Sequence, residues 1–316
     1  MFDSERAPAV IAPPPFTGAI PHERDAGSDN HPSDNHPSAT LPPATLPSDK
    51  PDHGAANLGS WVIGVDVGGS GIKAAPVDIT TGQLAADRVR LETPQPATPE
   101  AVASTVAEVV AQVLAECPPG SLAAGAAVGL TMPAVVRSGV IMTATNIDPS
   151  WIGTDAVQQF RTAIGHPTVV TNDADAAGVA EVRFGAGAGV PGVVLMVTLG
   201  TGIGTALFSN GVLVPNTELG HVRLNDGSDA ERSAASSVRK AEGLSMKRYA
   251  KRLQEYFEMV ESLLWPDLIL IGGGISKRAD EFLPHIELRT PVQAATLRNE
   301  AGIVGAALLA TASQDR

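Results

Sequence analysis

The fold is indicated by one stretch of sequence, Trp61-Val-Ile-Gly-Val-Asp-Val-Gly-Gly-Ser-Gly-Ile-Lys73. A hydrophobic run enters a glycine-rich turn and a second run, 74–77, follows at once, which predicts two strands joined by that turn. The same pattern returns about 130 residues later, in Val193-Val-Leu-Met-Val-Thr-Leu-Gly-Thr-Gly-Ile-Gly204. A strand, a glycine turn and a strand that occur twice predict a duplicated α/β unit.

Helix and strand signals around the two turns agree with this α/β fold. Thr98-Pro99 supplies a capping hydroxyl and a proline at the first helical position, and the valines of 102–113 then recur at helical spacing. Further strands are predicted at 126–130, 168–171 and 268–271, a helix at 174–184 and a long amphipathic helix around 249–263.

Backbone geometry makes both glycine turns candidate phosphate sites. Without Cβ atoms, the amide N–H groups of such a turn can approach an anion closely. Asp66 stands where it could hold Mg²⁺ through water, because Mg²⁺ keeps several of its waters. Each turn alone is equally compatible with a hairpin that binds no ligand, and Asp66 with a capping carboxylate. The candidate phosphate-binding residues are Asp66, Gly68, Gly69, Ser70, Gly71, Lys73, Gly200, Thr201, Gly202 and Gly204.

Polar side chains that suit a hydroxyl-rich ligand follow the predicted strands. Asn172-Asp173 comes directly after a strand, where open α/β sheets bind ligands, although either residue could simply cap the next helix. Glu218 and His221 are three residues apart and could share one pocket or lie on the surface. Together with Glu231, these carboxylates and amides could hold vicinal hydroxyls.

The composition argues against several classes of function. The 316 residues carry 22 basic and 34 acidic side chains, a net charge of −12 and a pI near 5.0, which disfavours a surface that coats nucleic acid. The single cysteine, Cys117, excludes an intramolecular disulfide and a cysteine zinc site. No apolar run is long enough to span a membrane, and no signal-peptide pattern is seen. We expect a cytoplasmic protein that binds neither nucleic acid nor membrane.

The first 58 residues differ in composition from the rest. They hold 11 of the 25 prolines and four of the seven histidines, with two short tandem repeats. Such a segment has too few large apolar side chains to offset the entropy lost on ordering. We therefore expect residues 1–58 to be a disordered tail.

The ordered set of motifs resembles the sugar kinases of the ROK family, which belong to the actin/hexokinase-like superfamily. The resemblance implies an actin/hexokinase-like (ribonuclease H-like) α/β fold, duplicated into two lobes around a central ligand cleft. The lobes would be 59–171 and 172–316, with the last helix packed back on the N-terminal lobe. The motifs, which span about Trp61 to Ala310, are Asp66-x-Gly-Gly-x-x-x-Lys73, Asn172-Asp173, Leu199-Gly-Thr-Gly-x-Gly204, Glu218-x-Gly-His221 and Gly272-Gly-Gly274.

A narrower resemblance is to the actinobacterial polyphosphate glucokinases. Most ROK proteins carry a Cys-rich zinc motif after the Glu-x-Gly-His turn, whereas these glucokinases and this chain lack it, so no structural zinc is expected. The resemblance implies a homodimer that phosphorylates glucose at the 6-hydroxyl with polyphosphate or ATP and Mg²⁺. The alternatives are an ATP-dependent kinase for another hexose such as mannose, and a non-catalytic sugar-sensing protein. The narrower resemblance rests on three stretches, Val212-Leu-Val-Pro-Asn-Thr-Glu-Leu-Gly-His221, Asp229-Ala-Glu231 and Leu288-Arg-Thr-Pro291.

The resemblance also implies roles for single residues. Asp173 would be the general base that accepts the proton of the sugar 6-hydroxyl, and Asp66 would organise Mg²⁺. Gly273 and Gly274 would lie beside an adenosine if ATP is used, although alone they indicate only a strand-to-helix turn. The residues that would hold the sugar hydroxyls are Asn172, Glu218, His221 and Glu231.

A polyphosphate chain would need basic side chains beyond the transferred phosphate. Lys247, Arg248 and Lys251 lie at the start of the long predicted helix, away from its apolar seam. They are a candidate polyphosphate track, and equally a solvated helix face.

Overall fold

The structure is a computed structural model that describes residues 59–123, 125–145 and 147–312. The predicted disordered tail, 1–58, lies outside the described residues. Every described residue belongs to one compact unit, so the division into lobes at residue 171 stays a prediction. Within these ranges no helix is long and apolar enough to cross a membrane.

Two mixed sheets share one strand order. The first consists of β1 (Trp61–Val67), β2 (Ile72–Asp78), β3 (Gln83–Leu84), β4 (Val89–Leu91), β5 (Val128–Met132) and β8 (Thr168–Asn172). The second consists of β9 (Val193–Leu199), β10 (Ile203–Ser209), β11 (Val212–Val214), β12 (Leu268–Gly272) and β13 (Val292–Ala294). In each, an antiparallel hairpin is followed by two parallel strands: β1–β2 with β5 and β8, and β9–β10 with β12 and β13. The predicted duplication is confirmed.

The strand register brings the ends of β1, β5 and β8 to one edge of the first sheet. Asp66 pairs with Thr131 of β5, and Met132 pairs with Asn172 of β8. In the second sheet, Thr198 of β9 likewise pairs with Gly272 of β12. Polar residues and glycines that are far apart in the sequence therefore meet where each sheet can bind a ligand.

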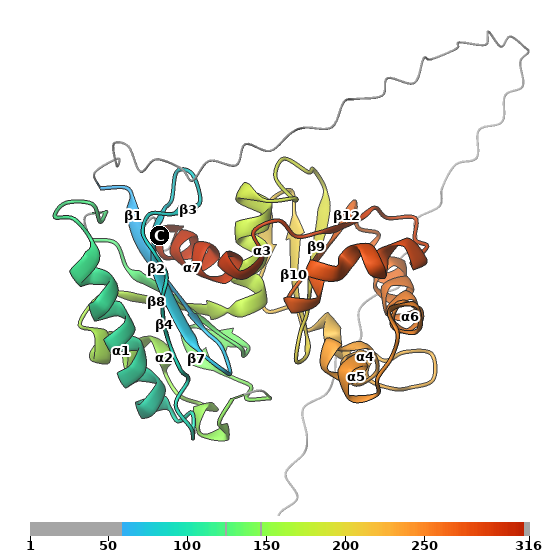
Figure 1. Cartoon of the computed structure of the whole chain (residues 1–316), viewed down its shortest axis with the longest axis horizontal. Helices are drawn as coiled ribbons and strands as arrows, with labels where there is room; N and C mark the ends of the chain where they lie inside the picture. The colour runs from blue at the N-terminus through green and yellow to red at the C-terminus, as the bar shows by residue number, and fades with distance from the viewer. Residues whose placement is uncertain (1–58, 124, 146, 313–316) are drawn as a thin grey trace, which may run out of the picture. The chain divides into compact units, whose positions relative to one another are not determined.

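Helices α1 (Pro99–Glu116) and α2 (Ala156–Ile164) cover one face of the first sheet (Figure 1). The predicted start of α1 is confirmed, because the Thr98 hydroxyl accepts the N–H of Ala101 and Pro99 is the first helical residue. On the second sheet, α6 (Met246–Leu264) buries its apolar side against β9 and β12. Beside it lie α4 (Ala230–Ala234) and α5 (Ser236–Ala241).

Helices α3 (Asp173–Phe184) and α7 (Ala301–Ala312) pack against each other between the two sheets (Figure 1). Helix α7 covers β1 and β5, and α3 covers β9 and β10. The helices approach closely at Gly305, where a Cβ atom would come within 1.7 Å of the Ala176 carbonyl oxygen. On β1, Gly64 provides the same close fit, because a Cβ there would lie 2.0 Å from the Ile303 carbonyl oxygen.

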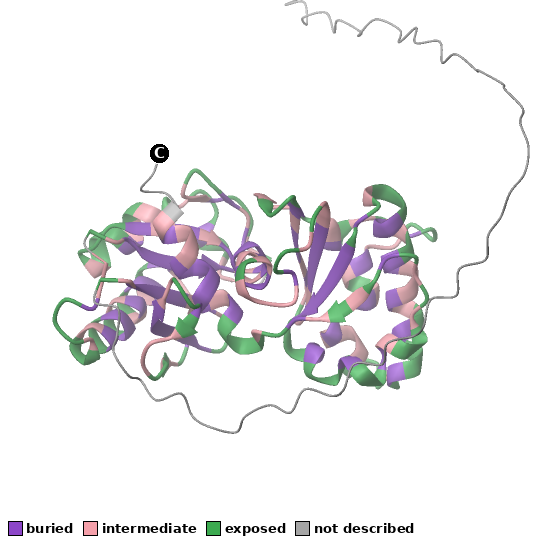
Figure 2. Cartoon of the chain, turned by 90° about the horizontal axis from the view of Figure 1, so that it is seen from above, coloured by how far each residue is buried: buried purple, intermediate pink, exposed green. Residues whose placement is uncertain are grey.

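Buried side chains concentrate in the sheets and on the helix faces turned toward them (Figure 2). Along β1, Ile63, Val65 and Val67 pack on the α1 side, and Val62 packs on the α7 side. This alternation places Asp66 on the α7 side, at the end of the strand. The remaining elements are β6 (Val136–Arg137), β7 (Val140–Ile141) and the short 3-10 helices η1 (Pro149–Trp151), η2 (Leu219–His221), η3 (Gly274–Glu281), η4 (Leu283–His285) and η5 (Arg298–Glu300).

Candidate active site

A cleft of about 650 Å³ is lined by the hairpin turns of both sheets. The β1–β2 turn is closed by a bond from Gly68 N to Gly71 O (3.1 Å), and the β9–β10 turn by one from Gly200 N to Gly202 O (2.9 Å). Gly71 does not line the cleft. The predicted residues that do are Asp66, Gly68, Gly69, Ser70, Lys73, Asn172, Asp173, Gly200, Thr201, Gly202, Gly204, Glu218, His221, Glu231, Gly273 and Gly274.

The glycines of the turns serve two different purposes. A Cβ atom at Gly69 or Gly200 would meet nothing within 4 Å, so the space beside both glycines is open to a ligand, although the Gly200 N–H is already bonded to Gly202. At Gly202 a Cβ would lie 2.2 Å from Oε2 of Glu231, and that oxygen accepts the N–H of Ile203 at 2.7 Å. Gly202 is therefore required for packing against Glu231, a role that the sequence did not indicate.

The β1–β2 turn is held by two side chains, one from β4 and one from the segment that follows β4. Arg90 donates to the carbonyl oxygen of Ser70 (2.9 Å), and its guanidinium fills the space beside Gly71. The Thr93 hydroxyl donates to the carbonyl oxygen of Gly68. Since these contacts fix the backbone, the amides of the turn are oriented before a ligand arrives.

Asp66 is held through both of its carboxylate oxygens. Oδ2 accepts a bond from Nζ of Lys73, its register partner on β2, and Oδ1 accepts one from the Thr131 hydroxyl, each at 3.1 Å. In the part of the chain that the structure describes, no group of three or more His, Cys, Asp or Glu could hold a metal ion. The donors present therefore fit Mg²⁺ bound by one carboxylate, waters and substrate phosphates, rather than a protein cage.

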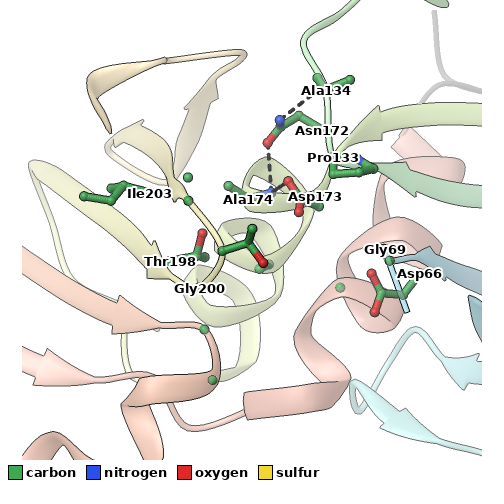
Figure 3. A pocket seen from close by; sticks show the side chains of 18 of the residues that line it. Asp66, Gly69, Pro133, Ala134, Asn172, Asp173, Ala174, Thr198, Gly200 and Ile203 are labelled. Carbon is green, nitrogen blue, oxygen red and sulfur yellow. Dashed lines mark hydrogen bonds between the residues drawn. The ribbon is translucent and has the colours of Figure 1, made fainter. Parts of the chain in front are cut away.

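Asp173 begins α3, and its carboxylate points into the same space as that of Asp66 (Figure 3). Oδ1 accepts the N–H of Ala174 at 2.9 Å. No bond to Oδ2 is found among the residues that the structure describes, so Oδ2 is available to a ligand. Burial, and after it the negative charge of Asp66, raise the pKa of Asp173 to about 7. A group with this pKa is suited to accepting a proton near neutral pH.

Asn172 caps α3, which is the local role that the sequence left open. Its Oδ1 accepts the N–H groups of Ala174 (2.8 Å) and Asp175 (3.0 Å), and its Nδ2 donates to the carbonyl oxygen of Ala134 (3.1 Å; Figure 3). These bonds join the start of α3 to the segment after β5. The contact of Asn172 with a sugar stays a prediction, which would use its second amide hydrogen.

The second polar group of the cleft is built around η2. His221 lies between two carboxylates, with Nδ1 3.2 Å from Oδ2 of Asp229 and Nε2 3.8 Å from Oε2 of Glu218. Burial raises the pKa of Glu218, His221 opposes this, and the charge of Glu231 raises it further. The sequence did not mark Asp229 as a residue that orients His221, although it lies two residues before Glu231 in a motif already noted.

Gly273 and Gly274 lie where β12 ends. Gly273 has a φ of +76°, and a Cβ there would lie 2.5 Å from the Leu199 carbonyl oxygen, so the turn itself requires glycine. Gly274 has open space on the cleft side. The structural role left open by the sequence is therefore present, and the position of an adenosine beside them stays a prediction.

The cleft also contains residues that the sequence did not single out. Arg298 has a φ of +51°, which is uncommon for a residue other than glycine. No motif marks it, because only the packing of α7 brings η5 to the cleft. The residues of this kind are Pro133, Ala134, Thr143, Thr145, Ala174, Ala177, Thr198, Ile203, Arg298, Asn299 and Gly302.

The predicted polyphosphate track is not part of the cleft. Lys247, Arg248 and Lys251 are exposed on α6, and none of them lines the cleft. The same helix buries Tyr249 and Leu253 on its inner side. A solvated helix face, which the sequence also allowed, accounts for the three residues, and their binding of polyphosphate stays a prediction.

The family model described as the ROK family matches residues 62–235, which include both glycine turns, Asp173, His221 and Glu231. The chain belongs to the ROK family. Solved structures similar to this ROK protein include sugar kinases of the family, and the predicted α/β, actin/hexokinase-like fold class is confirmed.

Three relatives show how similar this ROK protein is to known kinases. It is 49% identical over 250 residues to the polyphosphate glucokinase of Mycobacterium tuberculosis, which covers 79% of this chain and 91% of that protein. The crystal structure of inorganic polyphosphate/ATP-glucomannokinase from Arthrobacter sp. strain KM matches with a TM-score of 0.76 and 52% identity, over 80% of this chain and 99% of that one. A ROK glucokinase from Streptomyces griseus, in complex with glucose and AMPPNP, matches with a TM-score of 0.66 and 26% identity, over 80% and 99% of the two chains.

Proposed function

We propose that this ROK protein transfers the terminal phosphoryl group of polyphosphate or ATP to the 6-hydroxyl of glucose. The observation that carries the proposal is the position of Asp173, which shares one cleft with both glycine turns. The names of the Mycobacterium and Arthrobacter relatives support the two donors and the acceptor.

The acceptor sugar lies on the side of the cleft that contains Glu218, His221 and Glu231. Oε2 of Glu231 is occupied by the Ile203 N–H, so its Oε1 accepts a sugar hydroxyl. With its Nδ1 directed at Asp229, His221 presents Nε2 toward Glu218 and the ligand. A site that pairs each hydroxyl rejects sugars that leave one of these polar groups unpaired once the sugar covers it.

Proton transfer is the task of Asp173. Its Oδ2 accepts the proton of the 6-hydroxyl while that oxygen forms a bond to the terminal phosphorus. The bridging P–O bond of the donor breaks, and the shortened donor leaves with the electron pair. A positioned base of this kind contributes about 10²–10⁴-fold to the rate.

The donor phosphates are held by the two turns. The amide at Gly69 and the ammonium of Lys73 donate hydrogen bonds to the phosphate oxygens, and the open space beside Gly200 admits the phosphates to the second turn. Asp66 would hold Mg²⁺ through water, and the ion would supply charge neutralisation for the phosphates. Positioning and charge neutralisation account for most of the catalysis of phosphoryl transfer.

The alternatives differ in acceptor and in catalysis. Mannose as a second acceptor is favoured by the name of the Arthrobacter relative, a glucomannokinase. A sugar sensor that performs no transfer has no need of a carboxyl group whose pKa is raised to about 7 beside two phosphate turns. We also keep the homodimer and the cytoplasmic location as proposals, which rest on the resemblance to the family and on the single cysteine.

A product assay with both donors tests the proposed function. Glucose 6-phosphate is measured by a coupled dehydrogenase with ATP and, in parallel, with polyphosphate and no nucleotide. We expect product with both donors, and galactose, which differs at one hydroxyl, as the inactive control acceptor. If neither donor gives glucose 6-phosphate in the presence of Mg²⁺, the proposal is refuted.

A further inference from the structure

The loop that precedes Glu218 is joined to β6, which pairs with β7 in a separate small sheet, by one asparagine side chain. Asn216 accepts the N–H of Val136 through Oδ1 (2.9 Å) and donates through Nδ2 to the carbonyl oxygen of the same residue (3.0 Å). The amide thus takes the place of a neighbouring strand beside β6. We call this pair of bonds the Asn216 bridge.

The backbone of Asn216 is held by a second, buried group. Its N–H donates to Oδ2 of Asp175 at 2.8 Å, and Asp175 is only 1% exposed. The other oxygen of Asp175, Oδ1, is buried and has no hydrogen-bond partner among the residues that the structure describes. A buried carboxylate oxygen without a partner lowers stability, so the presence of this residue calls for an explanation beyond packing.

The loop is fixed from its other side by β10. Thr205 donates its hydroxyl to the carbonyl oxygen of Thr217, and the same hydroxyl accepts the N–H of Leu219 at 3.1 Å. Glu218 lies between these two bonded residues. The backbone of Glu218 is therefore held on both sides, although Glu218 has no capping bond of its own in η2.

The bridge ends on the segment that forms the wall of the cleft beside Asp173. Ala134 lines the cleft and accepts the bond from Asn172, and Val136 follows two residues later. The bridge thus links the loop of Glu218 to the segment joined to the start of α3. None of its bonds involves the two glycine turns.

We propose that Asn216 and Asp175 are positioning residues that set the distance between Glu218 and the wall of the cleft at Ala134, and thereby the affinity for the sugar. The inference rests on the proposed function, because it takes this side of the cleft as the acceptor site. Loss of the bridge weakens sugar binding and leaves donor binding unchanged.

The substitution Asn216→Gly isolates the bridge. Asn216 has a φ of +57°, which glycine adopts without strain, and the N–H to Asp175 remains. Two hydrogen bonds between the loop and β6 are lost. We therefore expect the KM for glucose to rise about tenfold, with the KM for both donors unchanged.

The matched control is Asn210→Gly. Asn210 also has a positive φ, +49°, and its side chain accepts one backbone N–H, from Gly192 at 3.0 Å. It lies in the β10–β11 turn and does not line the cleft. The two variants share the entropic effect of a new glycine on folding. Because only Asn216→Gly also removes the bridge, we expect only that variant to change the KM for glucose.

A second pair of variants tests Asp175. In Asp175→Asn an amide oxygen can still accept the Asn216 N–H, and we expect a glucose KM near that of the wild type. In Asp175→Ala the acceptor is lost, and the glucose KM rises as it does in Asn216→Gly. The affinity for glucose in the absence of a donor, measured by calorimetry, should be near that of the wild type in Asp175→Asn and lower in Asp175→Ala.

The result that overturns the inference is a wild-type glucose KM in Asn216→Gly, or an equal rise in the KM for glucose and for the donors. If the wild-type enzyme itself forms no glucose 6-phosphate and binds no glucose, the proposed function fails and the inference fails with it. The wild-type measurement therefore separates the two failures.

Discussion

Nζ of Lys73 lies 3.1 Å from Oδ2 of Asp66, across the hairpin formed by β1 and β2. The two residues proposed to hold the donor phosphates and the metal thus form one ion pair at the edge of the cleft, and both side chains keep some exposure to water. The ammonium has three donors, and Asp66 takes one of them. Lys73 can therefore bind a phosphate oxygen without leaving Asp66.

Lys73→Ala should weaken the binding of both donors to a similar extent. The terminal phosphates of ATP and of polyphosphate are the same group, and each would lose one charge-assisted hydrogen bond. We expect the KM for each donor to rise about tenfold or more and the KM for glucose to stay constant. Steady-state kinetics with both donors check this. A variant in which only the glucose KM changes would contradict the assignment of Lys73 to the donor.

Asp173→Asn should abolish most of the turnover and spare the binding of glucose. Asparagine can still accept the Ala174 N–H through Oδ1 but cannot take a proton from the sugar. We expect kcat to fall about 10²–10⁴-fold with either donor. The dissociation constant of glucose, measured by calorimetry, is the control. A kcat that remains close to the wild-type value would remove Asp173 from the role of base.

The raised pKa of Asp173 predicts how its carboxyl group titrates. In the protein its pKa is raised from 3.8 to about 7, first by burial and then by Asp66. The neutral acid therefore predominates below pH 7 and cannot accept a proton, so phosphoryl transfer should slow as the pH falls through that value. Carbon NMR of labelled aspartate in the metal-free protein, with Asp173→Asn for assignment, measures the pKa directly. A midpoint near 4 would contradict this prediction.

Two glycine-to-alanine variants should separate folding from ligand binding. In Gly305→Ala the new methyl group would lie 1.7 Å from the Ala176 carbonyl oxygen, and such overpacking lowers the free energy of unfolding by about 1–3 kcal/mol. In Gly69→Ala the methyl group meets nothing within 4 Å, so stability should be retained while the donor KM rises. Urea unfolding and kinetics are to be measured on both. Equal stability of the two variants would show that α3 and α7 can move apart without cost.

Neutralising Lys247, Arg248 and Lys251 together tests the track on α6. The three residues are exposed and lie outside the cleft, so only a donor that extends beyond it can reach them. We expect a higher KM for long polyphosphate, a smaller effect on short chains, and no effect on ATP. The effect should also weaken with added salt, because exposed charges are screened. Equal changes for ATP and polyphosphate would discard the track.

Much of the fold could be predicted from the sequence because its signals are local. The hydrophobic runs at 61–67 and 193–199 and the glycines that follow each run determine the two hairpins. Because the hairpin occurs twice, the two sheets are expected to have the same strand order. Asp173 could be found for the same reason, since it follows a strand and begins a helix whose cap, Asn172, is the adjacent residue.

The residues that the sequence analysis missed depend on contacts between distant parts of the chain. Asn216 and Val136 are 80 residues apart, and neither belongs to a motif that indicates the other. Arg298 reaches the cleft only because α7 packs on β1. The sequence predicts that Gly202 binds phosphate, which stays a prediction, but it does not indicate the contact of Gly202 with Glu231 of α4. Local patterns identify what a residue can do, and the packing decides which neighbours it has.

The position of α7 also bears on how the protein is made. All the strands of the first sheet leave the ribosome before α7 does, yet Val62 of β1 and Ala127 beside β5 are covered by Ile303, Val304 and Ala307 of that helix. A nascent chain in which the first glycine turn has already been synthesised therefore exposes one apolar face of the sheet until translation is almost finished. Truncation before residue 301 should leave a fragment with an exposed apolar surface, which binds chaperones, rather than a shorter active enzyme.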